Sequence, residues 1–209
     1  IVEREVQDIV DLGVDLQLNQ RVDDLDALFE EGFHAVLISV GAHEGIRLPI
    51  PGSKLDGVVI NTHFLRDVRL GKYEDNGSNV APLGERVLVL GGGNVAIDVA
   101  MTAKRLGADH VDIVSLEQHN ELPAHAGDVL DARQEDISFH YVWGPGEIGA
   151  RGNQGLDVKF FRCLSLWDRG GNFAPRFNPE ETLILDADSV IAAIGQQPEI
   201  GGAGTGMLK

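Results

Sequence analysis

The 209-residue chain has few cysteines, few aromatic residues and little positive charge. Its single cysteine, Cys163, excludes an internal disulfide, a paired-cysteine redox centre and any zinc or iron–sulfur site built from several cysteines. So little cysteine is also typical of a reducing compartment, and we therefore expect the protein to be cytoplasmic.

Basic side chains are scarce relative to acidic ones. The chain has 17 lysines and arginines against 33 aspartates and glutamates, which gives a formal net charge of −16. A surface this acidic repels nucleic-acid phosphates and anionic lipid headgroups. No apolar run approaches the ~20 residues of a membrane-spanning helix, and no basic-then-apolar leader opens the chain. We therefore expect neither nucleic-acid binding nor membrane insertion.

Glycine is abundant, with 26 residues. This is roughly twice the average usage of about 7% and indicates many tight turns. The chain begins at Ile1 rather than at a methionine, and residues 201–209 form a glycine-rich end. We expect it to be a piece of a longer protein; the alternative is a short protein whose amino terminus has been cleaved.

The spacing of apolar residues predicts helices where they recur every three or four positions and strands where they alternate or form short runs. Helices are expected at residues 1–12, 25–31, 62–70, 95–106 and 127–135. Strands are expected at 14–19, 33–40, 86–90, 111–114, 137–142, 156–166, 182–185 and 189–195. Residues 73–82 lack periodicity and form the predicted linker. The later alternation of strands and helices predicts an α/β fold with a parallel sheet.

One motif carries chemistry. The residues Gly91-Gly92-Gly93-Asn94-Val95-Ala96 fit the pattern G-x-G-x-x-A, between a predicted strand and a predicted helix. In such motifs the first glycine makes the tight turn, the second lets the backbone approach a pyrophosphate, and the small last residue keeps the helix close to the sheet. The amides at the start of the helix then face the phosphates. The motif predicts a dinucleotide site; the alternative is a plain strand–helix turn.

The end of the next strand bears on which dinucleotide is bound. An acidic residue there accepts hydrogen bonds from the adenosine ribose, whereas an arginine binds the 2′-phosphate of NADP(H). Here Leu116 and Glu117 follow the strand, and His119 is the only candidate cation nearby. Glu117 is thus either a ribose ligand that favours NAD(H) over NADP(H) or a solvated loop residue.

Several segments together resemble the glutamate synthase small-subunit family, which includes the flavin half of dihydropyrimidine dehydrogenase and the nicotinamide-dependent subunits of ferredoxin-linked oxidoreductases. The glycine motif with Asp98 resembles the family's nicotinamide-binding turn. Residues 35–42 and 48–52 are similar to its first crossover between flavin and nicotinamide domains, and residues 186–198 to the return crossover. The fold it implies has no redox disulfide.

The resemblance implies an α/β architecture in which a Rossmann-like NAD(P)-binding domain, residues 82–185, is inserted into a partial FAD-type domain, residues 1–81 and 186–209. Hydride would pass from the nicotinamide to FAD, and electrons would continue to an iron–sulfur or other partner subunit or domain. The resemblance assigns the pyrophosphate to the glycine motif. It assigns the nicotinamide end to Ala193, Ile194 and Gly195, and the neighbourhood of FAD to Val40, Gly41 and Ala42.

Two departures from the family matter. The FAD pyrophosphate motif, which precedes this region in the family, is not among the 209 residues. The family also places an arginine pair after the second strand, where this chain has Leu116 and Glu117. We therefore expect the chain alone to bind NAD(H) rather than FAD, and to be inactive alone.

No general acid, base or nucleophile is required, because the cofactors carry hydride chemistry. The histidines show no metal-ligand spacing, and Cys163 falls in an alternating strand, so no metal site and no catalytic side chain are predicted. Two other functions compete with the oxidoreductase: a module that senses NADH without turnover, and an interaction domain whose acidic surface docks a basic partner. The glycine motif and Glu117 disfavour the interaction domain.

Overall fold

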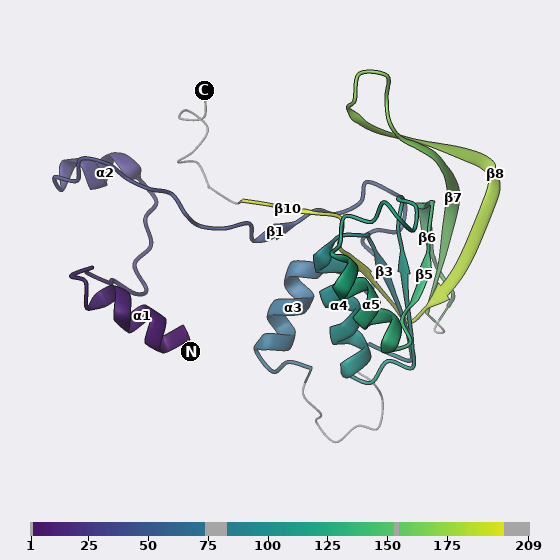
Figure 1. The fold of residues 1–209 in the computed structure, drawn as a ribbon, viewed down its shortest axis with the longest axis horizontal. Coiled ribbons are helices and arrows are strands. Elements are labelled where there is room, and N and C mark those ends of the chain that lie inside the picture. The colour runs from purple at the N-terminus through teal and green to yellow at the C-terminus, as the bar shows by residue number, and fades with distance from the viewer. Residues whose placement is uncertain (1, 74–82, 153–154, 199–209) are drawn as a thin grey trace. The chain divides into compact units, whose positions relative to one another are not determined.

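The computed structural model describes residues 2–73, 83–152 and 155–198, and the predicted linker lies mostly outside them. The described residues form two compact units, 2–41 and 42–198 (Figure 1). None of the described helices is long and apolar enough to cross a membrane.

The unit of residues 2–41 contains two helices, α1 (Val2–Val10) and α2 (Leu25–Glu30). Asp24 caps α2, because its Oδ1 accepts a hydrogen bond from the backbone N of Asp26 at 2.9 Å. Both helices were predicted and are confirmed. The predicted strands at 14–19 and 33–40 are wrong: both segments are irregular and no residue described in this unit is buried. A strand needs a hydrogen-bonded neighbour, and the described part of this unit contains no other strand.

The unit of residues 42–198 is built around a parallel five-stranded sheet with the order β2-β9-β3-β4-β5. Its strands are β2 (Val58–Ile60), β3 (Arg86–Leu90), β4 (His110–Val114), β5 (Ser138–His140) and β9 (Ser189–Ala192). The prediction of a parallel α/β sheet is confirmed. Both β2 and β9 pair in this sheet although they lie outside residues 82–185, and their assignment to an FAD-type domain stays a prediction.

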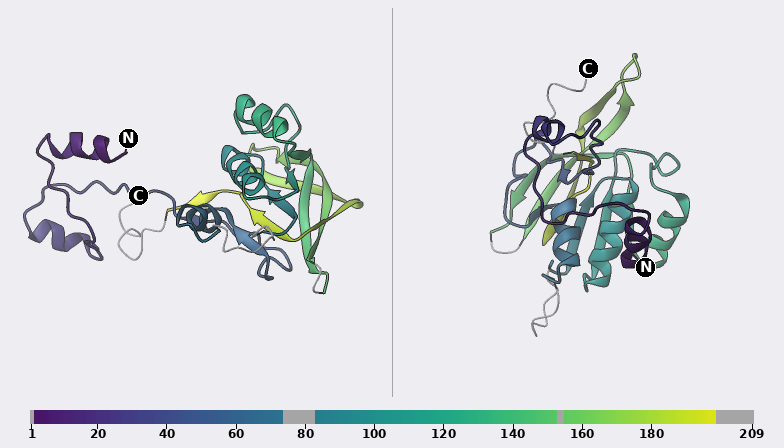
Figure 2. Two further views of the ribbon diagram at one scale, coloured as in Figure 1. Left: turned by 90° about the horizontal axis from the view of Figure 1, so that it is seen from below. Right: turned by 90° about the vertical axis from the view of Figure 1, so that its left-hand side faces the viewer.

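Each face of the sheet is covered by a different layer (Figure 2). The helices α3 (Asn61–Arg69), α4 (Asn94–Arg105) and α5 (Ala126–Gln134) pack on one face. An antiparallel sheet of β6 (Trp143–Ala150), β7 (Leu156–Trp167) and β8 (Phe173–Ala187) packs on the other. Alternate residues of β3 enter the two cores: Val87 and Val89 face the helices, and Leu88 and Leu90 face the antiparallel sheet. β3 is therefore buried on both faces.

Sequence patterns missed β6 because glycines interrupt its alternation. A Cβ added at Gly144 would lie 2.1 Å from Cε1 of Phe177, and one at Gly146 would lie 2.2 Å from Cε2 of Phe161. The glycines leave room for these two aromatic rings. A short ladder completes the unit, in which β1 (Glu44–Gly45) pairs antiparallel with β10 (Gln196–Gln197).

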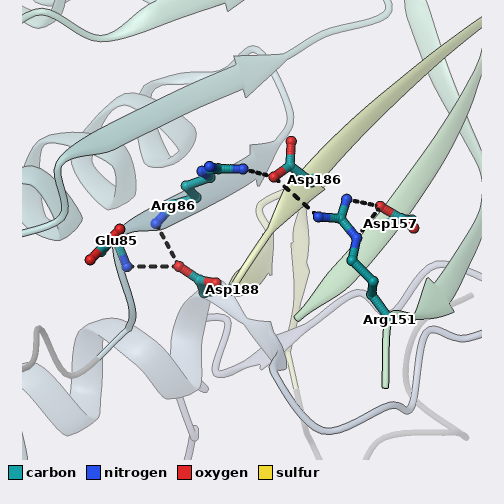
Figure 3. A network of polar contacts seen from close by, with 6 residues as sticks. All are labelled: Glu85, Arg86, Arg151, Asp157, Asp186 and Asp188. Carbon is teal, nitrogen blue, oxygen red and sulfur yellow. Dashed lines mark hydrogen bonds and ion pairs between the residues drawn. The ribbon is translucent and has the colours of Figure 1, made fainter. Parts of the chain in front are cut away.

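Polar contacts join the two sheets where β3 begins (Figure 3). Oδ2 of Asp188 accepts hydrogen bonds from the backbone N of Glu85 at 2.7 Å and of Arg86 at 2.9 Å. Arg86 also pairs with Asp186 of β8, and Arg151 pairs with Asp157 of β7. These contacts lie at the amino ends of the parallel strands and leave the carboxyl ends for the site described next.

Candidate functional site

The turn of Gly91–Gly93 connects the carboxyl end of β3 to α4. The backbone N of Gly91 donates a hydrogen bond to the carbonyl of Val114, at the end of β4, at 2.9 Å. Gly91 has φ +139°, and a Cβ added there would lie 2.3 Å from the carbonyl oxygen of Ala193. Only glycine fits this position, because the turn passes directly against the end of β9.

The next two glycines differ in what surrounds them. Gly92 is buried, and an added Cβ would lie 2.8 Å from Leu122 and 2.9 Å from Oε2 of Glu117. A Cβ added at Gly93 would meet no atom within 4 Å. Gly93 therefore borders open space at the start of α4, where backbone N–H groups and the helix dipole favour an anion.

The first residues of α4 link this turn to the core and to the following loop. Ala96 is fully buried between α4 and the sheet, and Val95 is partly buried. Oδ1 of Asn94 accepts a hydrogen bond from the backbone N of His125 at 2.8 Å. The carbonyl of Gly92 accepts another from Ala124 at 3.2 Å. The loop after β4 is therefore held against the glycine turn.

Glu117 lies in that loop with its backbone fixed. Its carbonyl accepts hydrogen bonds from the backbone N of Val142 at 3.1 Å and from Oγ of Ser115 at 3.2 Å. Its carboxylate faces Gly92 and is only partly exposed. The carboxylate and the glycine turn are therefore neighbours at the same edge of the sheet.

A cleft of about 550 Å³ opens beside Glu117. The loop after β4 forms one wall, and strands β7 and β8 contribute the other through Cys163, Trp167 and Phe173. No lysine or arginine is among the lining side chains in the described part of the chain, whereas Glu117 and Glu121 are. Sequence patterns did not predict the wall from β7 and β8, because these strands are remote in sequence from the glycine motif.

The predicted nicotinamide end lies beside the glycine turn. The backbone N of Ala193 donates to the carbonyl of Leu90 at 2.8 Å, and Ile194 packs in the core against the antiparallel sheet. The carbonyl of Gly195 accepts from Ile46 at 3.0 Å. Two segments far apart in sequence, 91–96 and 193–195, thus meet at the carboxyl edge of the sheet. Their roles toward a cofactor stay predictions.

The residues predicted near FAD fall in both units. Val40 and Gly41, which has φ +70°, belong to the unit of residues 2–41, and Ala42 opens the other unit. All three are exposed. Their proximity to FAD stays a prediction.

Cys163 is buried at the wall of the cleft. Burial raises the pKa of its thiol, with a smaller contribution of the same sign from the Glu117 carboxylate. A raised pKa disfavours the reactive thiolate. Among the residues that the structure describes, no group of histidine, cysteine and acidic side chains could hold a metal ion.

A buried polar pair that sequence patterns missed begins α3, at the carboxyl end of β2. The side chain of Asn61 is fully buried, and neither its Oδ1 nor its Nδ2 has a hydrogen-bond partner within the described chain; the same is true of Oγ1 of Thr62. A Cβ added at Gly45 would lie 2.6 Å from Oδ1 of Asn61, so the backbone of β1 covers this pair. No spacing signal marks a buried asparagine.

The chain is similar to known proteins over most of its length. A family model described as pyridine nucleotide-disulphide oxidoreductase matches residues 2–208. The chain is 32% identical, over 96% of its length, to the NADP(+)-dependent formate dehydrogenase subunit beta of Moorella thermoacetica, of which it covers 28%. It is 31% identical, over 95% of its length, to the glutamate synthase (NADPH) small chain of Azospirillum brasilense, of which it covers 43%. The chain thus spans less than half of either relative.

Among solved structures, FprA from Mycobacterium tuberculosis matches with a TM-score of 0.66. The match covers 85% of this chain and 54% of that one, at 20% sequence identity. At this identity the likeness shows a shared fold.

Proposed function

The chain belongs to the pyridine nucleotide-disulphide oxidoreductase family, and from this premise we propose that it is the nicotinamide-dinucleotide-binding portion of an FAD-dependent oxidoreductase. The observation that carries the proposal is the open space before Gly93 at the start of α4, where a side chain would fill the approach to a pyrophosphate. The family's name refers to a disulfide, but a chain with one cysteine cannot form one internally.

The residues of this chain bind and orient the cofactor. Gly91, Gly92 and Gly93 with the first turn of α4 hold the pyrophosphate, and Asn94 fixes the neighbouring loop through His125. The segment 193–195 lines the nicotinamide end. When bound, the nicotinamide supplies a hydride and FAD accepts it. No side chain of the site needs to transfer a proton for that step.

We propose that the chain prefers NADH to NADPH, although both curated relatives described above carry NADP in their names. The carboxylate of Glu117 faces the glycine turn, and no cation lines the described cleft beside it. A phosphate monoester carries about −1.5 to −2 charge near neutral pH. Two unit charges 4 Å apart repel by about 4 kcal/mol at an effective dielectric of about 20. Even a third of that, about 1.4 kcal/mol, makes a tenfold difference in affinity.

The partner is proposed to be an iron–sulfur or catalytic subunit or domain. The relative from Moorella is named a subunit, and that from Azospirillum a small chain. We also propose that the 209 residues alone transfer no electrons from NADH. In support, residues 2–41 form part of the portion assigned to the FAD-type domain, and no described residue among them is buried, so this part has no packed core here.

The first experiment compares nucleotide binding by calorimetry in the unmodified chain, Gly93→Val and the control Gly127→Val. Both glycines begin helices, and an added Cβ meets nothing within 4 Å at either. We expect Gly93→Val to abolish NADH binding while circular dichroism stays native, and Gly127→Val to bind normally. Unchanged affinity in a folded Gly93→Val variant would place the site elsewhere.

The second experiment measures NADH and NADPH affinities at moderate salt and near-neutral pH. We expect NADH to bind about tenfold more tightly, and the double variant Leu116→Arg with Glu117→Arg to shift the preference toward NADPH. Equal or tighter NADPH binding by the unmodified chain contradicts the preference and leaves the dinucleotide site itself standing.

The third experiment tests turnover and separates the oxidoreductase from an NADH sensor. The chain alone should reduce no dye acceptor with NADH. The longer protein that contains it should retain FAD through gel filtration and reduce the dye. A longer protein that binds NADH, holds no flavin and reduces nothing would favour the sensor.

A further inference from the structure

The cleft beside Glu117 is closed on its far side by the β7–β8 hairpin. Trp167 and Phe173 are the last pair in the register of these strands, because β7 ends at Trp167 and β8 begins at Phe173. Their rings lie edge to face, with centroids 5.6 Å apart and an interplanar angle of 75°. Both line the cleft, and both are 58% exposed. An edge-to-face pair is a favourable packing that holds each ring in place.

The charges of the cleft restrict what it can bind. Its described lining contains Glu117 and Glu121 and no lysine or arginine. A phosphate group is therefore disfavoured there, whereas an uncharged, flat group is not. The rest of the hairpin wall is largely apolar, with Leu164, Leu166 and the buried Cys163.

Glu117 connects the cleft to the glycine turn, although no residue of 91–93 lines the cleft. Glu117 both lines the cleft and faces Gly92, and its neighbour Leu116 lines the cleft as well. A ligand whose phosphates lie at Gly93 and whose ribose reaches Glu117 would extend its next group between the two walls. The cleft's volume of about 550 Å³ falls within the range of small-molecule sites.

We propose that Trp167 and Phe173 form the adenine-binding wall of this cleft, so that the base stacks on the Trp167 ring. The inference rests on the proposed function and adds to it a specificity element outside the strand–helix units of the parallel sheet. Aromatic rings bind bases through their faces without reading hydrogen-bonding edges. The site therefore recognises the adenosine half of the dinucleotide by shape and stacking, and Glu117 recognises its ribose.

The test uses ADP-ribose and NADH as ligands of the 209-residue chain and measures affinity by calorimetry. We expect Trp167→Ala to weaken both ligands about tenfold, equivalent to ~1.4 kcal/mol. Trp167→Phe, which keeps a ring, should recover most of that loss. The matched control is Ile184→Ala, because Ile184 is a 62% exposed apolar residue of β8 that does not line the cleft. It should bind both ligands normally.

A spectroscopic readout reports contact with the base. The chain has only two tryptophans, so Trp167 is the sole tryptophan in a Trp143→Phe background and can be excited selectively over the two tyrosines. Adenosine monophosphate should quench that emission, and nicotinamide mononucleotide should not.

The outcomes are separable. If Gly93→Val abolishes ADP-ribose binding while Trp167→Ala leaves it unchanged, the proposed function stands and the adenine wall is wrong. If Trp167→Ala instead changes only the oligomeric state in sedimentation, the hairpin is a contact between copies and the proposal is also overturned. If the unmodified chain binds neither ligand, the proposed function is wrong, and the adenine wall is wrong with it.

Discussion

Two apolar runs in this chain have similar sequences, but one forms a buried strand and the other forms no strand. Residues 33–40 and 86–90 are both nearly continuous apolar segments that end at a glycine. The second forms β3, in which Val87, Leu88, Val89 and Leu90 are all at most 2% exposed. The first forms no strand, and its Leu37 is 90% exposed.

The difference lies in the neighbours that each run has. β3 pairs with β4 on one side and β9 on the other, and its two faces are covered by helices and by the antiparallel sheet. Residues 33–40 have no strand beside them in the described part of their unit. A local apolar pattern therefore indicates that a segment is able to form a buried strand. Whether the strand forms depends on neighbouring strands from distant parts of the chain.

The largest difference in stability is expected between substitutions of the glycines that follow the two runs, Gly91 and Gly41. Gly91→Val should destabilise residues 42–198 by about 3–5 kcal/mol, since its Cβ would overlap the carbonyl of Ala193 at a φ that valine resists. Gly41→Val also strains a positive φ, but no described residue of its unit is buried, so it should leave the unfolding of 42–198 unchanged. Urea denaturation followed by circular dichroism measures both. Equal losses would break the comparison.

The second largest difference in unfolding free energy is expected between alanine substitutions of leucines within the two runs. Leu88→Ala removes a side chain that is 1% exposed and should cost about 2–5 kcal/mol of unfolding free energy. Leu37→Ala should stay within about 0.5 kcal/mol, as at other exposed positions. Chemical denaturation of both variants at the same temperature decides this. A large loss from Leu37→Ala would mean that residues 33–40 are packed in solution.

A buried amide without hydrogen-bond partners should lower the stability of residues 42–198. Asn61 is fully buried with both polar atoms of its side chain unpartnered in the described chain. Replacing it by the apolar Leu should raise the free energy of unfolding by about 1 kcal/mol, because no desolvated amide is then left unpaired. Asn172→Leu is the control, since that exposed amide bonds to Asp168. A loss of stability in Asn61→Leu would show that water satisfies the amide.

The smallest effect concerns pH. The Arg151 guanidinium holds the pKa of the Asp157 carboxyl below its usual range. Because the folded pKa is the lower one, this pair stabilises the fold above the unfolded pKa of about 3.9, and the contribution disappears as pH falls through the folded value. Asp157→Asn should therefore be less stable than the unmodified chain near neutral pH, and the gap should close at acid pH.

Urea midpoints measured across that pH range provide the readout. The control is Asp23→Asn, which removes an exposed ion pair with Arg21 in residues 2–41 and should not change the unfolding of 42–198. A gap that persisted at acid pH would show that the charge of the Asp157 carboxylate is not the cause of the difference in stability.

Much of the region around the glycine turn could be predicted because its signals are local. One short segment contains the run Arg86–Leu90, the glycine turn and the apolar face of α4. Two of its residues have a steric reason in the structure: Gly91 lies against the carbonyl of Ala193, and Ala96 is buried on the face of α4 that packs on the sheet. The missed strand β6 and the wrongly predicted strand at 33–40 depend instead on contacts with distant parts of the chain. The absence of a side chain at Gly144 is explained by Phe177 of β8 and by Leu116 of the loop after β4, which occupy the space a Cβ would fill.

The amino-acid sequence alone established the parallel α/β class, the position of the glycine turn and the acidic residue that follows the next strand. It could do so because backbone conformation at glycine and apolar periodicity are properties of neighbouring residues. Only the tertiary structure decided that β9 lies beside β3, that Ala193 meets Gly91, and that Trp167 and Phe173 face Glu117 across a cleft. Such contacts join segments distant along the chain, and they form only where packing of the whole unit compensates the loss of chain entropy.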